Sequence, residues 1–259
     1  MRLHEYEGAE IFEKFGIPVP RRGVIRTVEG ALKMADEIGY PVVLKSQVLV
    51  GGRGLAGGIK VADSSDELEK LTDELLNTEI KGCPVKEIMI SEKAKIAKEL
   101  YMAITIDGYS GKPIVVVSTE GGVHIEKTAK ESSDKIASVK IDPKWGLYHY
   151  QAQNLLRQLN LSPKPLTACS DILVRLYKVF EKYEAIIAEI NPLVILENGG
   201  IVAVDAVLEI DDSAMFRLKK TLALPSENRL GNSLENKGKE IGVTYVDLDG
   251  DIGLISSGA

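Results

Sequence analysis

Two apolar, β-rich runs around a short glycine turn near residue 200 constrain the fold most strongly. They are EAIIAEINPLVIL at 184–196 and IVAVDAVLEI at 201–210, joined by ENGG. Strands joined by so short a turn pair antiparallel. A second pair of β-rich runs, within 99–122, surrounds a Gly, Ser and Pro turn and predicts another hairpin. With helical segments between them, these hairpins favour an α+β fold over a strictly alternating parallel sheet.

Periodicity divides the rest of the chain into further helices and strands. Apolar residues recur at helical spacing in five segments, and the extended runs between them are rich in Val and Ile. We expect helices over 3–15, 28–40, 64–80, 150–160 and 171–183, and strands over 41–50, 58–63 and 87–95.

The composition excludes several other classes of protein. Of the 259 residues, 44% are hydrophobic and 27% charged, so the chain can bury a core. The net charge of −6 argues against a nucleic-acid partner. No apolar run reaches the ~18 residues of a membrane span. Cys83 and Cys169 are far apart, which excludes a disulfide scaffold and suits a reducing compartment. Since the N-terminal residues also show no targeting peptide, we expect a cytoplasmic protein without a membrane partner.

A glycine-rich segment, KSQVLVGGRGLAGGIK at 45–60, lies between two of the expected strands. Glycines let backbone N–H groups approach phosphate oxygens closely, and Lys45 and Arg53 add positive charge. The spacing is neither that of a Walker loop nor that of a Rossmann fingerprint. The segment is therefore a candidate phosphate-binding loop, and the alternative is a mobile hairpin that only connects two strands.

Three oxygen-bearing side chains, Glu189, Asn191 and Asp205, lie on the hairpin near residue 200. Glu189 and Asn191 share a face because side chains alternate along a strand. Carboxylate and amide oxygens, with no histidine or thiolate nearby, suit Mg²⁺. The alternative is a set of polar residues on the solvent face. The apolar flanks favour a buried strand, whose polar groups need partners.

The turn decides whether these side chains meet. A two-residue turn at Asn198 and Gly199 would point Asp205 away from Asn191. A three-residue turn over 197–199, with Gly199 in the left-handed conformation, would place Asn191 opposite Asp205. Pro192 can also introduce a bulge that changes this register.

The remaining motifs are expected to be structural. The segment STEGGVHIEK at 118–127 is typical of a strand-to-helix glycine turn. The three histidines share no cluster, which disfavours a metal or proton-relay role. The aromatic residues Trp145, Tyr148 and Tyr150 are expected to pack against the protein, as are both cysteines.

Taken together, these stretches resemble the β subunits of succinate–CoA ligase, also called succinyl-CoA synthetase, which are ATP-grasp proteins. The resemblance rests on LHEYEGAEIFEKFGIPVP, KSQVLVGGRGLAGGIKV, IAKELYMAITID, STEGGVHIEK, IAEINPLV with VAVDAVL, and DDSAMFR, in that order. It implies an ATP-grasp fold of two α+β subdomains, one at 21–98 and the other at 1–20 with 99–224. A linker at 225–241 and the start of a truncated flavodoxin-like α/β CoA-ligase domain at 242–259 would follow.

The resemblance also assigns roles to individual residues. An alignment on IAKE places Ser91 at the position of a family glutamate and Glu92 one residue later. Glu189 would orient a phosphohistidine, and the other assigned residues would hold the nucleotide and its metal. The phosphate contacts would be Lys45, Gly52, Arg53 and Gly54, the further nucleotide-site residues Glu92 and Glu99, and the Mg²⁺ ligands Asn191 and Asp205.

The reaction that the resemblance implies couples succinate, CoA and a nucleoside triphosphate to succinyl-CoA through a phosphohistidine on a partner α subunit, which also carries the CoA site. Pro20 stands where GTP-preferring members differ, so ATP is the expected substrate. Ser257 stands where the family has an asparagine at the acid site. The alternatives are therefore the β subunit of a malate or citrate ligase, or a non-catalytic ATP-binding module. Without most of the CoA-ligase domain, the chain is expected to bind MgATP but not to complete acyl-CoA synthesis alone.

Overall fold

The computed structural model describes residues 1–120 and 136–222, with the side chains of 219–222 left out, and separate positions near the C-terminus: 234, 237–238, 241–243, 245–246 and 250–257. Contacts divide the chain into two units, Met1–Ala223 and Leu224–Ala259. All elements named below belong to the first unit. Residues 121–127 of the STEGGVHIEK motif and most of the expected linker at 225–241 lie outside the described residues.

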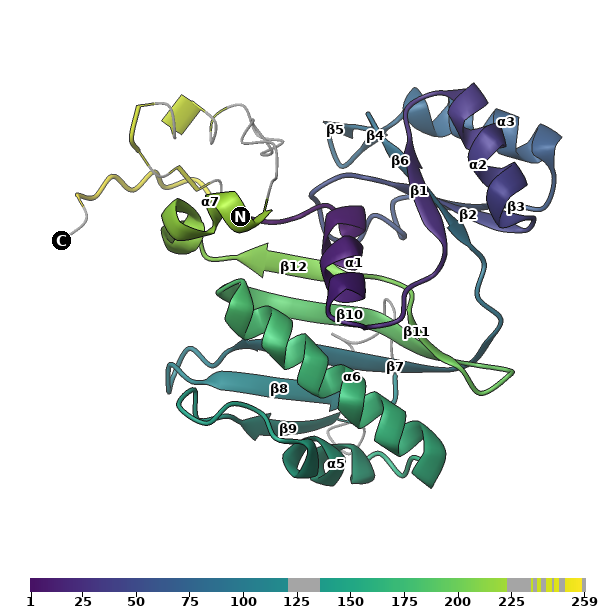
Figure 1. Ribbon diagram of the computed structural model, residues 1–259. Coiled ribbons are helices and arrows are strands. Elements are labelled where there is room, and N and C mark those ends of the chain that lie inside the picture. The colour runs from purple at the N-terminus through teal and green to yellow at the C-terminus, as the bar shows by residue number, and fades with distance from the viewer. Residues whose placement is uncertain are drawn as a thin grey trace. The chain divides into compact units, whose positions relative to one another are not determined.

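An antiparallel four-stranded sheet occupies the N-terminal part of the first unit (Figure 1). Helices α2 (Val28–Ile38) and α3 (Ser65–Leu76) pack on each other and on this sheet. Leu44, Leu68 and Ile90 are fully buried between the layers. A two-stranded hairpin, β4 (Glu79–Ile80) and β5 (Cys83–Pro84), follows α3. In sheet order, the four strands are β1 (Arg22–Ile25), β6 (Ile88–Glu92), β2 (Val42–Ser46) and β3 (Ile59–Ala62).

Helix α3 shows how local chemistry sets an element's bounds. The Ser64 hydroxyl accepts a hydrogen bond from the Glu67 backbone N–H at 3.4 Å, and this cap begins the helix. The helix was expected to continue to residue 80, but it ends at Leu76. The Asn77 side chain donates to the Asp73 carbonyl at 2.9 Å, and the next residues enter the β4 hairpin instead.

A second, six-stranded antiparallel sheet forms the rest of the unit. Helix α6 (Pro163–Lys182) packs on β10 and β7, and α5 (His149–Arg157) packs on α6 (Figure 1). Helix α1 (Glu5–Lys14) contacts β12 and α6, and a short 3₁₀ helix, η3 (Asp212–Ala214), leads into α7 (Met215–Leu222). In sheet order, the strands are β11 (Ile201–Ala203), β10 (Ala185–Leu196), β7 (Ile96–Ile106), β8 (Pro113–Ser118) and β9 (Ile136–Lys140), with β12 (Val207–Ile210) also paired to β10. The predicted α+β class is confirmed.

Two expectations about the helical region between residues 145 and 183 were wrong. Helix α6 begins at Pro163 rather than 171, because proline fits the first helical position, where no N–H bond is needed. Trp145 and Tyr150 are each 62% exposed and do not pack into the core. The buried face of α5 is made by smaller residues such as Leu155. Of the cysteines, Cys169 is buried and Cys83 is only half-buried.

The hairpin between β10 and β11 adopts the three-residue turn. The Leu196 N–H donates to the Gly200 carbonyl at 2.8 Å, and Gly199 has a φ of +81°. Leu193 pairs with Ala203, so the same register places Asn191 opposite Asp205. The two-residue alternative, which would have turned Asp205 away, is excluded.

The hairpin is interrupted beside Pro192. The register between β10 and β7 shifts between Ile190 and Leu193, as a bulge at this proline predicts. The returning strand was expected to be continuous, but β11 ends at Ala203 and β12 begins at Val207. Residues 204–206 separate the two strands opposite the bulge, and Asp205 lies in this gap, although the Val204 N–H still donates to the Pro192 carbonyl at 3.1 Å. Among the described residues, no helix is long and apolar enough to cross a membrane.

Candidate functional site

Four charged side chains from distant segments meet between the two sheets. They are Glu5 at the start of α1, Lys45 on β2, Arg53 in the glycine loop and Asp205 in the gap after β11; we call them the charged quartet. The Lys45 ammonium donates to Glu5 Oε1 at 2.7 Å and to the Val204 carbonyl at 2.6 Å. The Arg53 guanidinium binds Glu5 Oε2 directly and lies 3.4 Å from Asp205 Oδ1.

The quartet is largely withdrawn from water. The side chains of Glu5 and Lys45 are 3% and 5% exposed, whereas that of Asp205 is 28% exposed. Burial by itself raises the pKa of the Glu5 carboxyl, but Lys45 and Arg53 outweigh it and the pKa is lowered. For Asp205, burial and the negative charge of Glu5 prevail over the two cations, and the pKa is raised. The two carboxyls of the quartet are therefore not equivalent.

The glycine loop presents backbone donors beside these cations. Within the described structure, the N–H groups of residues 51–55 donate to no other protein atom. The loop is closed by a hydrogen bond from the Gly58 N–H to the Arg53 carbonyl at 2.8 Å and tied by Lys81, whose ammonium donates to the Gly51 carbonyl at 2.7 Å. Gly52 has a φ of +71°, which favours glycine there. Consecutive unpaired N–H groups of this kind form a concave anion site.

The hairpin supplies a second cluster, of oxygen-bearing groups. The Tyr101 hydroxyl donates to Glu189 Oε2 at 3.3 Å, and Asn191 also hydrogen-bonds Glu189. Burial raises the pKa of Glu189, and the nearby charge of Asp205 adds to this, although Asn191 and Tyr101 act in the opposite direction. Burial and the adjacent Glu189 raise the pKa of Tyr101, so it remains a proton donor.

These oxygens fit a hard divalent cation. Asp205 and Glu189 offer carboxylate oxygens and Asn191 an amide oxygen, the ligand types that Mg²⁺ takes. In the part of the chain that the structure describes, no group of three His, Cys, Asp or Glu residues could hold a metal ion alone. A cation at this place would therefore need oxygens from water or from a bound phosphate as well.

Residues 2–195 match the ATP-grasp domain family. The β subunit of an ADP-forming succinate–CoA ligase from Halorubrum lacusprofundi is 41% identical over 259 residues, which are 100% of this chain and 68% of that protein. The chain belongs to the succinate–CoA ligase β-subunit family. A GDP-forming β subunit from Thermus thermophilus is also 41% identical, with the same coverage. Overall identity to the β-subunit family therefore does not separate the two nucleosides.

The fold extends to more distant enzymes. ATP citrate lyase from Methanothrix soehngenii superposes with a TM-score of 0.69 at 20% identity, covering 93% of this chain and 59% of that one. This likeness shows a shared fold with a member of another class of acid–CoA enzyme.

The residues that the sequence assigned to this β-subunit site are brought together only in part. Lys45, Arg53 and Asp205 meet in the quartet, with Gly52 and Gly54 in the loop beside them. Glu92 lies at the end of β6 and accepts a hydrogen bond from Arg21 at 3.1 Å in an exposed ion pair. Glu99 is half-buried on β7 opposite Val194. Among the described residues, neither glutamate bonds to the quartet.

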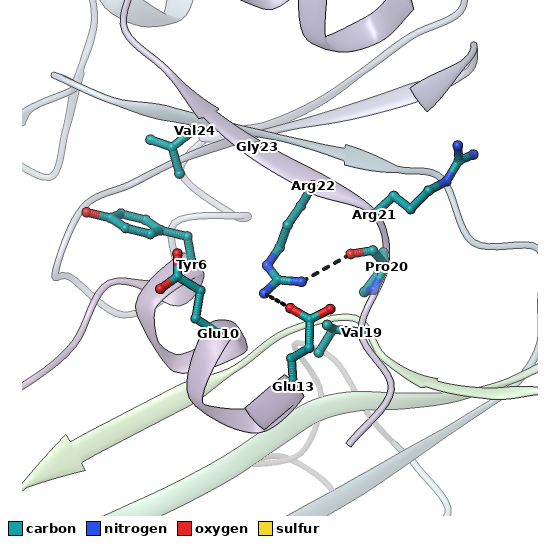
Figure 2. Close-up of a pocket in the computed structure, with 9 residues that line it drawn as sticks. All are labelled: Tyr6, Glu10, Glu13, Val19, Pro20, Arg21, Arg22, Gly23 and Val24. Carbon is teal, nitrogen blue, oxygen red and sulfur yellow. Dashed lines mark hydrogen bonds and ion pairs between the residues drawn. The ribbon is translucent and has the colours of Figure 1, made fainter. Parts of the chain in front are cut away.

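A separate pocket of about 410 Å³ opens between α1 and β1 (Figure 2). The Arg22 guanidinium bonds Glu13 at 3.0 Å and the Pro20 carbonyl at 3.3 Å, whereas Arg21 points away from them (Figure 2). Pro20 therefore has its carbonyl engaged and, as a proline, has no N–H to donate. The other lining residues are Tyr6, Glu10, Val19, Gly23 and Val24.

Two residues of the site were missed by the sequence analysis. Glu5 is one of two acidic residues in the first turn of α1, where acidic residues are common, and nothing in its local pattern indicates burial. Tyr101 lies within an apolar strand and is indistinguishable there from a packing aromatic. Only the pairing of β7 with β10, which places Ala103 opposite Glu189, brings Tyr101 near that carboxylate.

The raised pKa of Glu189 predicts a pH-dependent effect of Glu189→Gln. Since folding disfavours the ionised carboxylate, the wild-type chain loses stability as pH rises above the ordinary value of 4.5. We expect the variant to be more stable by roughly 0.5–2 kcal/mol at pH 8, with the gain vanishing below pH 4.5. Urea unfolding at both pH values measures this. Glu197→Gln, an exposed position in the same hairpin, is the control, and an equal gain at both pH values would contradict the prediction.

Proposed function

We propose that the chain is the nucleotide-binding β subunit of an ADP-forming succinate–CoA ligase that works with an α subunit carrying a phosphohistidine. The observation that supports this most directly is that the hairpin segment meets both cations: Lys45 donates to the Val204 carbonyl at 2.6 Å, and Arg53 lies 3.4 Å from Asp205. Arg53 belongs to the same loop as the amides of 51–55, which donate to no atom of the described structure. Cations and amides on one side and metal-ligating oxygens on the other are what a nucleotide polyphosphate with its cation requires.

In this proposal the chain's own residues neutralise and position charge. Lys45 and Arg53 bind phosphate oxygens, with Arg53 offering the planar donor fork that suits them. The amides of residues 51–55 hold the phosphates from the backbone side. Charge that develops on the transferred phosphoryl group is stabilised by these same donors, which folding has already placed.

Asn191 and Asp205 would hold Mg²⁺. When bound, the ion would neutralise phosphate charge and orient the phosphoryl group for in-line transfer. Glu189 would orient the partner's phosphohistidine, and the Tyr101 hydroxyl would hold Glu189 in position.

The acid substrate, the nucleoside, the location and the CoA site are each proposed on different grounds. Succinate is favoured by the 41% identical relatives, because the likeness to ATP citrate lyase concerns the fold alone. ATP is favoured over GTP by Pro20, which stands where GTP-preferring members of the family differ. A cytoplasmic location follows from the sequence expectation, and CoA would be bound by the partner.

Calorimetric titration with ATP and with GTP, in Mg²⁺, tests this proposal. We expect ATP to bind more tightly, and Arg53→Ala to weaken it roughly tenfold or more because the guanidinium fork is lost. Arg26→Ala is the matched control, since that side chain is 73% exposed and paired with Glu87. If neither nucleotide binds, the proposal is refuted. With the α subunit added, ATP should then yield phosphohistidine, which a binding module would not produce.

A further inference from the structure

The charged quartet has no net charge to offer a phosphate. Its two cations, Lys45 and Arg53, are matched by two carboxylates, Glu5 and Asp205. Glu5 uses both of its oxygens, one for each cation, whereas Asp205 reaches only Arg53 among them. Glu5 therefore occupies at once the two side chains on which phosphate binding would depend.

The cations have little surface left for a further ligand. The Lys45 side chain is 5% exposed and also donates to the Val204 carbonyl, and Arg53 is 12% exposed and also donates to the Ser46 carbonyl. A phosphate oxygen that contacts either of them must take the place of an existing acceptor. The Glu5 carboxylate is the acceptor that the two share and the one that resembles a phosphate in charge and in its paired oxygens.

We infer that Glu5 is an internal counter-ion of the phosphate site, which holds Lys45 and Arg53 in the nucleotide-free chain and gives them up to phosphate oxygens. This inference rests on the proposed function. Glu5 is then a positioning residue. Its carboxylate holds the two cations close together before the nucleotide binds, and it lowers the affinity for phosphate by competing for them. The free energy needed to release Glu5 from the two cations reduces the net binding free energy of the nucleotide.

The location of Glu5 allows such a release. It is the first residue of α1, so that only the first turn of the helix need move. That turn is held by local bonds, such as the Gly8 N–H to the His4 carbonyl at 3.1 Å, and by one longer-range bond of 3.4 Å from the Tyr6 N–H to Gln47 Oε1. Asp205, by contrast, is fixed from its own backbone side, since its Oδ1 accepts from the Ala206 N–H at 2.8 Å.

The experiment compares Glu5→Gln with Glu10→Gln, the same charge change at an exposed position of the same helix. The probes are inorganic phosphate and MgATP, titrated calorimetrically into the whole chain. Glu5→Gln leaves the quartet with a net positive charge, so we expect phosphate and MgATP to bind about tenfold more tightly than to the wild type. Glu10→Gln should not change the affinity. Equal or weaker binding by Glu5→Gln would overturn the inference.

Hydrogen exchange on the wild-type chain gives a second test that needs no variant. MgATP should slow exchange in residues 51–55 and accelerate it at Gly8 and Ala9, where the first turn loosens as Glu5 is released. Slowed exchange in the loop with no acceleration in α1 would show that Glu5 keeps its cations, which refutes the inference and leaves the proposed function intact. No binding of ATP by the wild type would refute the proposed function itself.

Discussion

Lys45→Met is expected to lower the free energy of unfolding by about 3–5 kcal/mol, because it removes one member of a buried charge group and leaves its partner behind. The Glu5 carboxylate, 3% exposed, would then retain only Arg53 against the combined charge of itself and Asp205. Methionine keeps most of the side-chain volume, so the loss reports charge rather than a cavity. Urea unfolding at pH 7 measures it, with exposed Lys112→Met as a control expected within about 0.5 kcal/mol of the wild type.

The double variant Lys45→Met with Glu5→Gln separates this explanation from a general intolerance of change. Removing both partners leaves Arg53 paired with Asp205 and restores neutrality. We therefore expect the double variant to be more stable than Lys45→Met alone by at least about 1 kcal/mol. If the two losses simply add, the quartet is not an energetic unit, and the account of the site given above fails with it.

The sequence predicted those features that depend on interactions between residues close together in the chain. The hairpin near residue 200 and the glycine loop follow from turn chemistry and alternation, which act over a few residues. Whether Asn191 stands opposite Asp205 depended on one choice, the turn length, and the Leu196–Gly200 hydrogen bond with a φ of +81° at Gly199 decides it. The family resemblance added roles for these residues that spacing alone does not supply.

The features of the site that the sequence did not predict are set by long-range packing. Glu5 and Lys45 are 40 residues apart, and they meet because α1 packs on β12 of the second sheet while its first residue reaches Lys45 on β2 of the first. The break at 204–206 lies opposite the bulge of a neighbouring strand, which is distant in sequence from the residues that pair with it. No window of sequence contains this information.

Asp205→Asn is expected to weaken ATP binding when Mg²⁺ is present but not when it is absent. In Mg²⁺, the variant loses an ionised ligand, and ATP should bind roughly tenfold or more weakly than to the wild type. Without Mg²⁺, the same change removes a negative charge from the proposed phosphate site and frees Arg53 from an acceptor at 3.4 Å, so ATP should bind as tightly or more tightly.

A loss of ATP affinity in Mg²⁺ without a loss in EDTA distinguishes a metal ligand from a structural residue. If Asp205 only held Arg53 in place, its removal would weaken ATP binding equally with Mg²⁺ and with EDTA. Asp36→Asn, at an exposed position on α2, controls for the loss of one negative charge elsewhere on the chain and should leave both affinities unchanged. Because Glu5 shares Arg53 with Asp205, the affinity gained in EDTA should be larger still in the Glu5→Gln background, where neither carboxylate competes for the guanidinium.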